Sequence, residues 1–247
     1  MWVLDQVNSR LVRYKDGKLE ATIPMDRLNA QDIAVTEDGS VALLDRYGGK
    51  DVALLDPEGK PIGSLPLVGE GIEDAGRVTG VYVEGTDVYV EREHGPLIRI
   101  GNTAGEAAPS RDELPGRPSR DGKSYLKAGI IDAAEGRTYV VANDRPSEEH
   151  RFTRELRFDG TVWSIQLLDT DLVGTIYFAV EIDEGAEHVV LLSCLDAQTG
   201  SPEGTAVLPA NTMPEESFRD FVVLDGGGVL AAIRSESGVT YQQYDCE

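Results

Sequence analysis

The sequence predicts an all-β protein, and three of its features support this fold class. Apolar runs of roughly four to eight residues alternate with Gly, Asp and Pro along the chain, and no amphipathic helical pattern stands out. Turn sequences with Asp before Gly recur, as in TEDGS, RDGK and FDGT, and such pairs supply the positive φ angles that tight hairpins need. Strands that end in an acidic or polar residue recur about every 40 to 50 residues, the length of a four-stranded blade. Together they predict a β-propeller of about six four-stranded blades.

The predicted blades follow one another along the chain as a single domain. The strand ends that mark them are Asp5, Asp45, Glu91, Asn143, Glu181 and Arg234. The blades are expected at 1–25, 30–68, 75–110, 124–165, 166–209 and 217–247. The first lacks an opening strand and the last stops after its third strand, so both terminal blades are predicted to be incomplete. Either upstream residues have been trimmed, or the ring closes with shortened blades.

Three segments depart from the repeat. Residues 101–123 are polar, rich in Gly and Pro and longer than the usual connection, which predicts a loop excursion. Residues 153–174 do not show where the fourth blade ends and the fifth begins. Residues 211–221, with Pro214 near their start, are compatible with a short helical turn that brings Arg219 toward the channel.

The charge balance excludes two classes of partner. Asp and Glu number 44 against 23 Lys and Arg, a net charge of −21 that repels nucleic-acid backbones and anionic membranes. No apolar run approaches the ~20 residues that cross a bilayer, so direct membrane insertion is not expected. A protein or peptide partner is favoured, with a glycan as an alternative.

The two cysteines leave two interpretations open. Cys194 and Cys246 lie in separate strand-like segments without CxxC spacing, which argues against a structural zinc site. They form either a disulfide that ties down the C-terminus in an oxidising compartment or two buried thiols. Because the incomplete first blade leaves room for an upstream leader or anchor, a periplasmic or cell-surface location is favoured.

The repeat resembles that of NHL-type propellers. WVLDQVNSRLVRYKDGK has an apolar strand, an Asp, then Asn8 and Arg10, and a second apolar strand that leads to an Asp-Gly turn. DIAVTEDGSVALLDRYGGKDVALLDPEGKPIGSLP is similar to the fuller form of that repeat. The third unit matches loosely, and the last three keep only the strand–turn rhythm. The resemblance implies a propeller and leaves the activity open, because one fold hosts many functions.

Oxygen-bearing side chains at the strand ends form a candidate metal set. The set is Asp5, Asp45, Glu91, Asn143 and Glu181. If these ends converge on one mouth of a propeller, their oxygens suit Ca²⁺ or Mg²⁺. Propeller enzymes of the lactonase and lyase type use an axial metal in this general way, so a metal-dependent hydrolase or lyase is the alternative function. In the NHL-like pattern the same acid caps its own turn by accepting backbone N–H bonds, which is the competing structural interpretation.

The candidate binding residues lie in predicted loops and near the channel. They are Arg46, Tyr47, Lys50, His94, Arg219 and Arg234. The loop DRYGGKD combines an aromatic ring and two cations with a flexible Gly pair, so a partner or a sugar could stack on Tyr47. His94 is the one candidate general base. These features favour a non-catalytic recognition scaffold that binds a protein, or an extended peptide or glycan, through its loop face.

Overall fold

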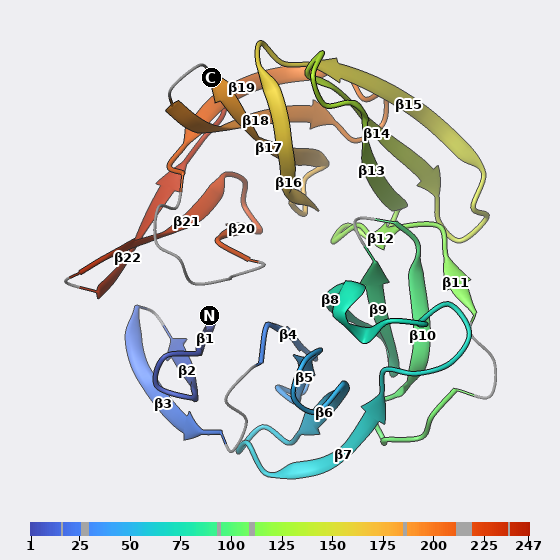
Figure 1. Ribbon diagram of the computed structural model, residues 1–247, viewed down its shortest axis with the longest axis vertical. Coiled ribbons are helices and arrows are strands. Elements are labelled where there is room, and N and C mark those ends of the chain that lie inside the picture. Colours follow the sequence, from blue (N-terminus) through green and yellow to red (C-terminus); the bar gives the residue numbers. More distant parts are fainter. Residues whose placement is uncertain are drawn as a thin grey trace. The chain divides into compact units, whose positions relative to one another are not determined.

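The strands of the protein form six antiparallel sheets that follow the order of the chain. The computed structural model describes residues 1–15, 17–25, 30–92, 95–108, 112–184, 187–210, 219–236 and 238–247. Over these residues the only helix is the short 3-10 helix η1 (Ala75–Arg77). Four sheets have four strands and two have three (Figure 1). This is the fold class of a six-bladed β-propeller, so the predicted class is confirmed, with three-stranded sheets first and last.

Contacts divide the chain into two compact units. The first comprises Met1–Glu93 and Leu97–Leu114, and the second comprises His94–Pro96 and Pro115–Glu247. In each unit every sheet is a meander, in which consecutive strands pair side by side in opposite directions.

The first unit holds three sheets. The first has β1 (Trp2–Asp5), β2 (Arg10–Lys15) and β3 (Lys18–Pro24). The second has β4 (Asp32–Val35), β5 (Val41–Asp45), β6 (Asp51–Leu55) and β7 (Pro61–Pro66). The third has β8 (Val78–Glu84), β9 (Asp87–Arg92), β10 (Leu97–Asn102) and β11 (Glu113–Leu114).

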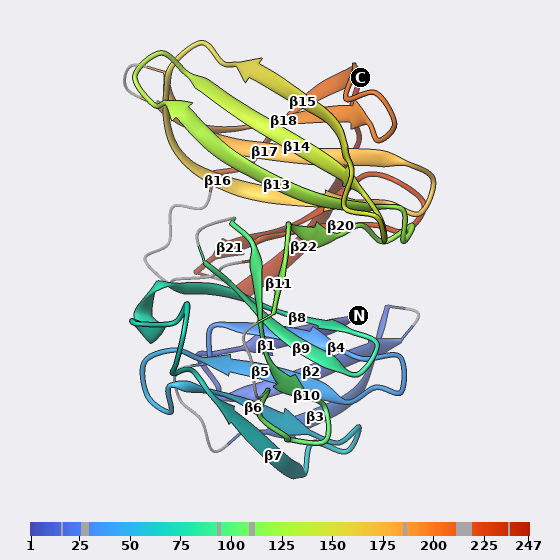
Figure 2. The same ribbon diagram turned by 90° about the vertical axis from the view of Figure 1, so that its right-hand side faces the viewer.

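The second unit holds the other three sheets, and the pairing of β13, β14 and β15 is visible in Figure 2. The fourth sheet has β12 (Arg117–Pro118), β13 (Ser124–Asp132), β14 (Arg137–Asp144) and β15 (His150–Arg157). The fifth has β16 (Thr161–Thr170), β17 (Thr175–Glu184), β18 (Glu187–Asp196) and β19 (Pro202–Leu208). The sixth has β20 (Phe221–Val223), β21 (Val229–Ser235) and β22 (Gly238–Tyr244).

Two of the expected boundaries differ from those of the structure. The segment 101–123, expected to be a loop throughout, contains β11 and β12, because strands of two residues are too short to show alternation. The fourth sheet therefore begins at Arg117 and not at 124. The fifth begins at Thr161, inside the segment that the sequence left unresolved. The helical turn predicted at 211–221 falls mostly outside the described residues, and Phe221 begins β20.

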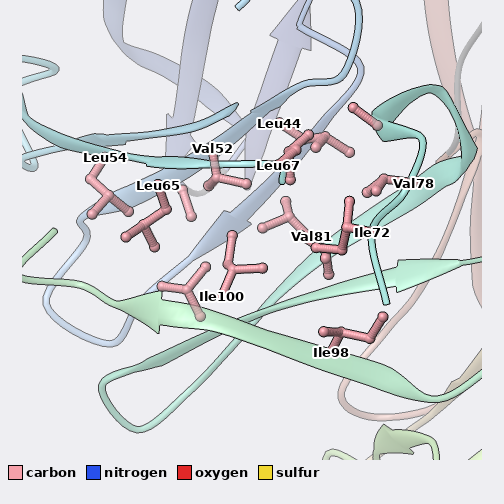
Figure 3. Packing of buried hydrophobic residues seen from close by; sticks show 14 residues of the cluster. Leu44, Val52, Leu54, Leu65, Leu67, Ile72, Val78, Val81, Ile98 and Ile100 are labelled. Carbon is pink, nitrogen blue, oxygen red and sulfur yellow. The ribbon is translucent and has the colours of Figure 1, made fainter. Parts of the chain in front are cut away.

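Middle strands are buried on both faces, which explains their continuous apolar sequences. Successive residues of a strand point to opposite faces. In β5, Leu43 belongs to the core between the first and second sheets, whereas Leu44 belongs to the core between the second and third. Figure 3 shows Leu44 in this second core with residues of β6 to β10. All five residues of β5 are accordingly buried.

Two of the three quoted Asp-Gly turns, TEDGS and RDGK, are hairpin turns with the expected backbone, whereas FDGT connects β15 of the fourth sheet with β16 of the fifth. Gly39 and Gly122 have φ angles of +88° and +73°, which glycine adopts without steric cost. Each follows an Asp whose carboxylate accepts a backbone N–H within the same turn, Asp38 from Ser40 and Asp121 from Lys123. These pairs therefore end one strand and start the next, as the sequence predicted.

Candidate functional site

The acids that end β1 and β5 close the turns that follow them. Asp5 accepts hydrogen bonds from the backbone N of Asn8 (3.1 Å) and from Arg10 Nε (2.6 Å). Burial alone would raise the pKa of Asp5, but its hydrogen bonds with Asn8 and Arg10 outweigh burial and hold the pKa below its ordinary value. Asp45 accepts from the backbone N of Gly48 (2.7 Å) and of Gly49 (2.8 Å). Both carboxylates have the turn-closing geometry that competes with metal binding.

The candidate metal set is divided between the two units. Across the described residues, no group of three or more His, Cys, Asp or Glu side chains is placed to hold a metal ion. Asp5, Asp45 and Glu91 belong to the first unit, and Asn143 and Glu181 belong to the second. Ca²⁺ binding stays a prediction.

Asn143 lies on a different strand from the one that the sequence predicted. The sequence placed Asn143 at the end of a second strand, level with Asp45, Glu91 and Glu181. It lies instead on β14, the third strand of its sheet, where it pairs with Tyr125 near the start of β13. The strand count slipped by one because β12 has only two residues.

The loop after β5 is anchored by Arg46 and presents Tyr47. Arg46 is buried, and its Nη1 donates to the carbonyl oxygens of Gly76 (2.8 Å) and Val78 (3.2 Å), at the start of the third sheet. The guanidinium carbon of Arg46 lies 4.5 Å from the ring centroid of Tyr47, which is 50% exposed. Lys50 is exposed at the end of the loop. Binding by Tyr47 or Lys50 stays a prediction, whereas Arg46 joins two sheets.

The remaining predicted binding residues lie in separate places. Arg234 Nη2 is 2.7 Å from Asp220 Oδ1, and both side chains are mostly buried, so this arginine balances a charge within the sixth sheet. Arg219 is exposed just before that sheet. His94 lies outside the described residues. Roles for Arg219 and His94 in binding stay predictions.

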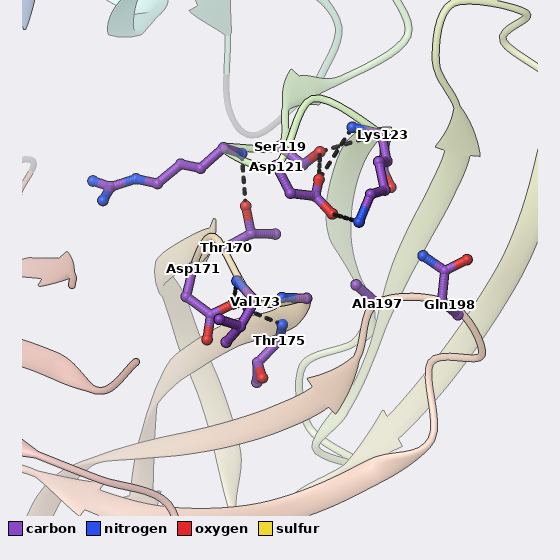
Figure 4. Close-up of polar contacts among 12 residues, drawn as sticks. Ser119, Asp121, Lys123, Thr170, Asp171, Val173, Thr175, Ala197 and Gln198 are labelled. Carbon is purple, nitrogen blue, oxygen red and sulfur yellow. Dashed lines mark hydrogen bonds and ion pairs between the residues drawn. The ribbon is translucent and has the colours of Figure 1, made fainter. Parts of the chain in front are cut away.

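A cluster that the sequence analysis did not single out lies in the second unit. It consists of the turns that join the first two strands of the fourth, fifth and sixth sheets, residues 119–123, 170–175 and 224–228, which we call the turn face. Figure 4 shows the first two of these turns. Arg120 links all three: its backbone N donates to Thr170 Oγ1 (2.8 Å), and its guanidinium pairs with Asp225 (2.6 Å) and Asp169 (3.6 Å).

Asp171 holds the middle turn of the turn face in place. Its side chain is buried, and Oδ1 accepts from the backbone N atoms of Val173 (2.9 Å), Gly174 (2.8 Å) and Thr175 (2.9 Å). Its Oδ2 accepts from the hydroxyl of Tyr177 (3.2 Å). A buried carboxylate that accepts several N–H and O–H bonds fixes the local backbone strongly.

The hydroxyl of Tyr177 connects this turn to the next one. It accepts from the backbone N of Gly228 (2.9 Å) and donates to Asp171. Burial raises the pKa of Tyr177, so the hydroxyl stays protonated as a donor at neutral pH. Gly228 has a φ angle of +84°, which brings its N–H to this hydroxyl at a position that disfavours other residues.

The middle turn exposes two adjacent aliphatic side chains. Leu172 is 52% exposed and Val173 is 76% exposed. The backbone N of Leu172 donates to the carbonyl oxygen of Asp225 (3.2 Å), so the neighbouring turn also supports it. The carboxylates of Asp169 and Asp225 are partly or largely exposed in the same cluster. The turn face therefore presents an apolar tip beside acidic groups.

The first turn of the turn face contains an aspartate, Asp121, that should make folding stability depend on pH. The Asp121 side chain is only 4% exposed, and this burial alone would raise its pKa. Its carboxylate accepts hydrogen bonds from Ser119 Oγ (2.6 Å) and from the backbone N of Lys123 (3.1 Å). These bonds outweigh burial, so the pKa of Asp121 is lowered overall. A lowered pKa contributes stability that is present above the unfolded-state pKa and is lost as the pH falls through the folded-state pKa.

Replacing Ser119 with Ala should therefore move acid unfolding, followed by circular dichroism, to a higher pH. Ser147→Ala, at an exposed turn serine that accepts from the backbone N of Glu149, is the control and should leave the midpoint unchanged. Equal midpoints for Ser119→Ala and the wild-type protein would contradict the role assigned to this hydroxyl.

The turn face was missed because its parts are far apart in sequence. The Asp-Gly pair at 121–122 and the sequence LDGGG at 224–228 each predict a hairpin turn and nothing more. Arg120 and Asp225 are separated by 105 residues, and no local pattern pairs them. The available signal was the repeat itself, since the three turns occupy equivalent places in successive sheets.

Comparisons with known proteins support the fold and no family. No protein-family model matches the chain, and no curated protein sequence matches it. A crystal structure of a protein of unknown function from Bacteroides caccae is similar with a TM-score of 0.48 and 12% identity, over 81% of this chain and 76% of that one. Two structures of BBS1N in complex with ARL6DN, soaked with lead or with mercury, have TM-scores of 0.49 and 0.50. Each is 12% identical and covers 100% of this chain and 88% of its own.

At this level of identity the likeness concerns the fold alone. The NHL-type resemblance of the first two repeats has no matching family model and remains an interpretation of the sequence. The described residues include no helix of the length and apolarity needed to cross a membrane.

Proposed function

We propose that the protein is a non-catalytic recognition scaffold whose turn face binds a protein partner. The observation that supports this proposal best is the pair Leu172 and Val173, exposed by 52% and 76% on a turn that the buried Asp171 fixes through three backbone hydrogen bonds. Exposing aliphatic side chains to water contributes nothing to folding. A rigid turn that presents them lowers the entropy cost of ordering on binding.

The surroundings of the tip specify the chemistry of the partner. Asp169 and Asp225 flank the apolar tip, and the chain as a whole carries a net charge of −21. A complementary partner has an apolar socket for Leu172 and Val173 and basic side chains around it. Two side chains are too few for a stable interface, which buries about 800 Å² on each partner, so the turns 119–123 and 224–228 would complete it.

Site-specific crosslinking tests the proposal directly. The photoreactive residue p-benzoylphenylalanine replaces Val173 in one preparation and Val207, another exposed valine (61%) that lies on β19, in a second. After irradiation in extract of the source cells, a discrete crosslinked protein is expected from position 173 and not from position 207. Equal products from both positions, or none from 173, would overturn the assignment.

Purified partner then gives a quantitative prediction. The double variant Leu172→Asp with Val173→Asp should weaken binding at least about tenfold, whereas Val207→Asp should not change it. Urea unfolding of both variants should stay close to wild type, because all three side chains are exposed. Affinity should also fall between about 0.05 and 0.5 M NaCl, since the flanking carboxylates are accessible to salt. Unchanged affinity of the double variant would contradict the proposal.

A further inference from the structure

The fifth sheet extends beyond the part of its face that the sixth sheet covers. The strands β16, β17 and β18 each have 10 residues, whereas β20 and β21 have 3 and 7. The core between these two sheets uses Ala179 of β17 and Val190 of β18. Residues two apart in a strand share a face, so Glu181 and His188 continue this face. Half-buried Glu181 pairs with Val190 at the edge of the core, whereas the exposed His188 lies beyond that edge.

An exposed tryptophan lies beside His188 at this edge of the core. A β-bulge at Trp163 interrupts the pairing of β16 with β17, between the pairs Val162–Ile182 and Ser164–Glu181. Val162 points into the opposite core, while the Trp163 side chain is 61% exposed. Its ring meets the ring of His188 edge-on, with centroids 5.9 Å apart and an interplanar angle of 66°. Bulges re-aim side chains, and this one directs a large aromatic ring to solvent.

Three polar side chains next to the ring hold one another in place. Glu181 Oε2 accepts from Ser164 Oγ (3.0 Å) and from Gln166 Nε2 (3.0 Å), and Gln166 Nε2 also donates to Ser164 Oγ (2.6 Å). The planar carboxylate and the planar amide are therefore oriented before any ligand arrives. A carboxylate has about four lone-pair positions and an amide carbonyl has two, so both groups retain acceptor capacity. We call Trp163, Ser164, Gln166, Glu181 and His188 the ledge.

The chemistry of the ledge matches one class of ligand. A pyranose ring has an apolar face of C–H groups and a rim of hydroxyls. The apolar face stacks on an indole, and the hydroxyls donate to a carboxylate in charge-assisted bonds. The net charge of −21 disfavours sulfated or uronic polymers. We propose that the ledge binds a neutral glycan, with Trp163 as the stacking platform and with Glu181 and Gln166 as partners for sugar hydroxyls.

Affinity electrophoresis tests this proposal on the intact chain. Gels contain a neutral polysaccharide (barley β-glucan, xyloglucan, galactomannan or laminarin) or an anionic one (alginate or heparin). We expect at least one neutral polymer to retard the wild-type protein and the anionic polymers to leave its mobility unchanged. Trp163→Ala should lower the affinity at least about tenfold, and Trp163→Phe, which keeps a ring, should retain part of it. Tyr241→Ala, at an aromatic residue of β22 that is 40% exposed, is the matched control and should bind like wild type.

Fluorescence provides a second readout that does not depend on mobility. The chain has two tryptophans, so a Trp2→Phe background reports Trp163 alone. Oligosaccharides of the retarding polymer should shift its emission, and Glu181→Ala in that background should remove the shift. The proposal is overturned if no neutral polymer retards the protein, if binding survives Trp163→Ala, or if a tryptic peptide digest shifts the emission and no sugar does. Crosslinking from position 173 should be unaffected by Trp163→Ala. Loss of glycan binding would therefore contradict only the proposal for the ledge, and loss of crosslinking only the proposal for the turn face.

Discussion

Replacing Cys246 with Ser is expected to lower the free energy of unfolding by about 4 kcal/mol, the loop-closure value for a crosslink of this span. Cys194 and Cys246 form a disulfide across 52 residues of chain, which settles in the structure the choice that the sequence left open. Cys246 is the position to change, since Cys194 is buried in the core between the fifth and sixth sheets and its replacement would also disturb packing.

Urea unfolding with and without reductant measures this effect. The wild-type protein should lose a similar free energy when it is reduced, and Cys246→Ser should not respond to reductant. The bond fastens the residues after β22 to the fifth sheet, where the backbones of Thr205 and Glu247 exchange two hydrogen bonds of 3.1 Å. A loss below about 1 kcal/mol would show that these hydrogen bonds and the surrounding core hold the segment without the crosslink.

Replacing Asp171 with Ala is expected to cost about 3 kcal/mol of folding stability. The variant removes the acceptor of three backbone N–H groups, those of Val173, Gly174 and Thr175. The hydroxyl of Tyr177 also loses its hydrogen-bond acceptor. Because this carboxylate is buried, water cannot replace it freely. Urea unfolding gives the free energy, and crosslinking from position 173 should weaken as the turn loses its fixed shape.

A second turn aspartate supplies the comparison. Asp196 accepts from the backbone N atoms of Gln198 (3.2 Å) and Thr199 (2.7 Å) in a solvent-exposed turn, so Asp196→Ala should cost only about 1 kcal/mol. The difference between the two variants reports burial together with the additional hydrogen bond that Asp171 accepts. If both variants lost the same free energy of unfolding, the claim that Asp171 fixes its turn more strongly than an exposed aspartate does would be wrong.

The fold was predictable because its signals are local and repeated. The apolar run of β5 and the Asp-Gly turns at Gly39 and Gly122 each specify a strand or a turn from a few consecutive residues. The turn-closing role of Asp5 and Asp45 was likewise present in the resemblance as the competing interpretation. A periodic chain therefore reveals its sheets even where no family model matches it.

The candidate sites were less predictable because they depend on irregular and distant elements. The two-residue β12 left no pattern, and missing it displaced Asn143 by one strand. The bulge that exposes Trp163 interrupts the alternation on which a sequence-based face assignment rests. The contact between Arg120 and Asp225 depends on three sheets being formed first.

The two faces of β17 serve different neighbours, which limits how the second unit could be dissected. Phe178 packs toward the fourth sheet, and Tyr177 and Ala179 pack toward the sixth. A truncation that removed the sixth sheet would expose to water the apolar side chains of the fifth sheet that the sixth sheet buries. The remaining fragment would therefore be prone to self-association. Each blade of this unit is thus an interdependent part and not an autonomous module.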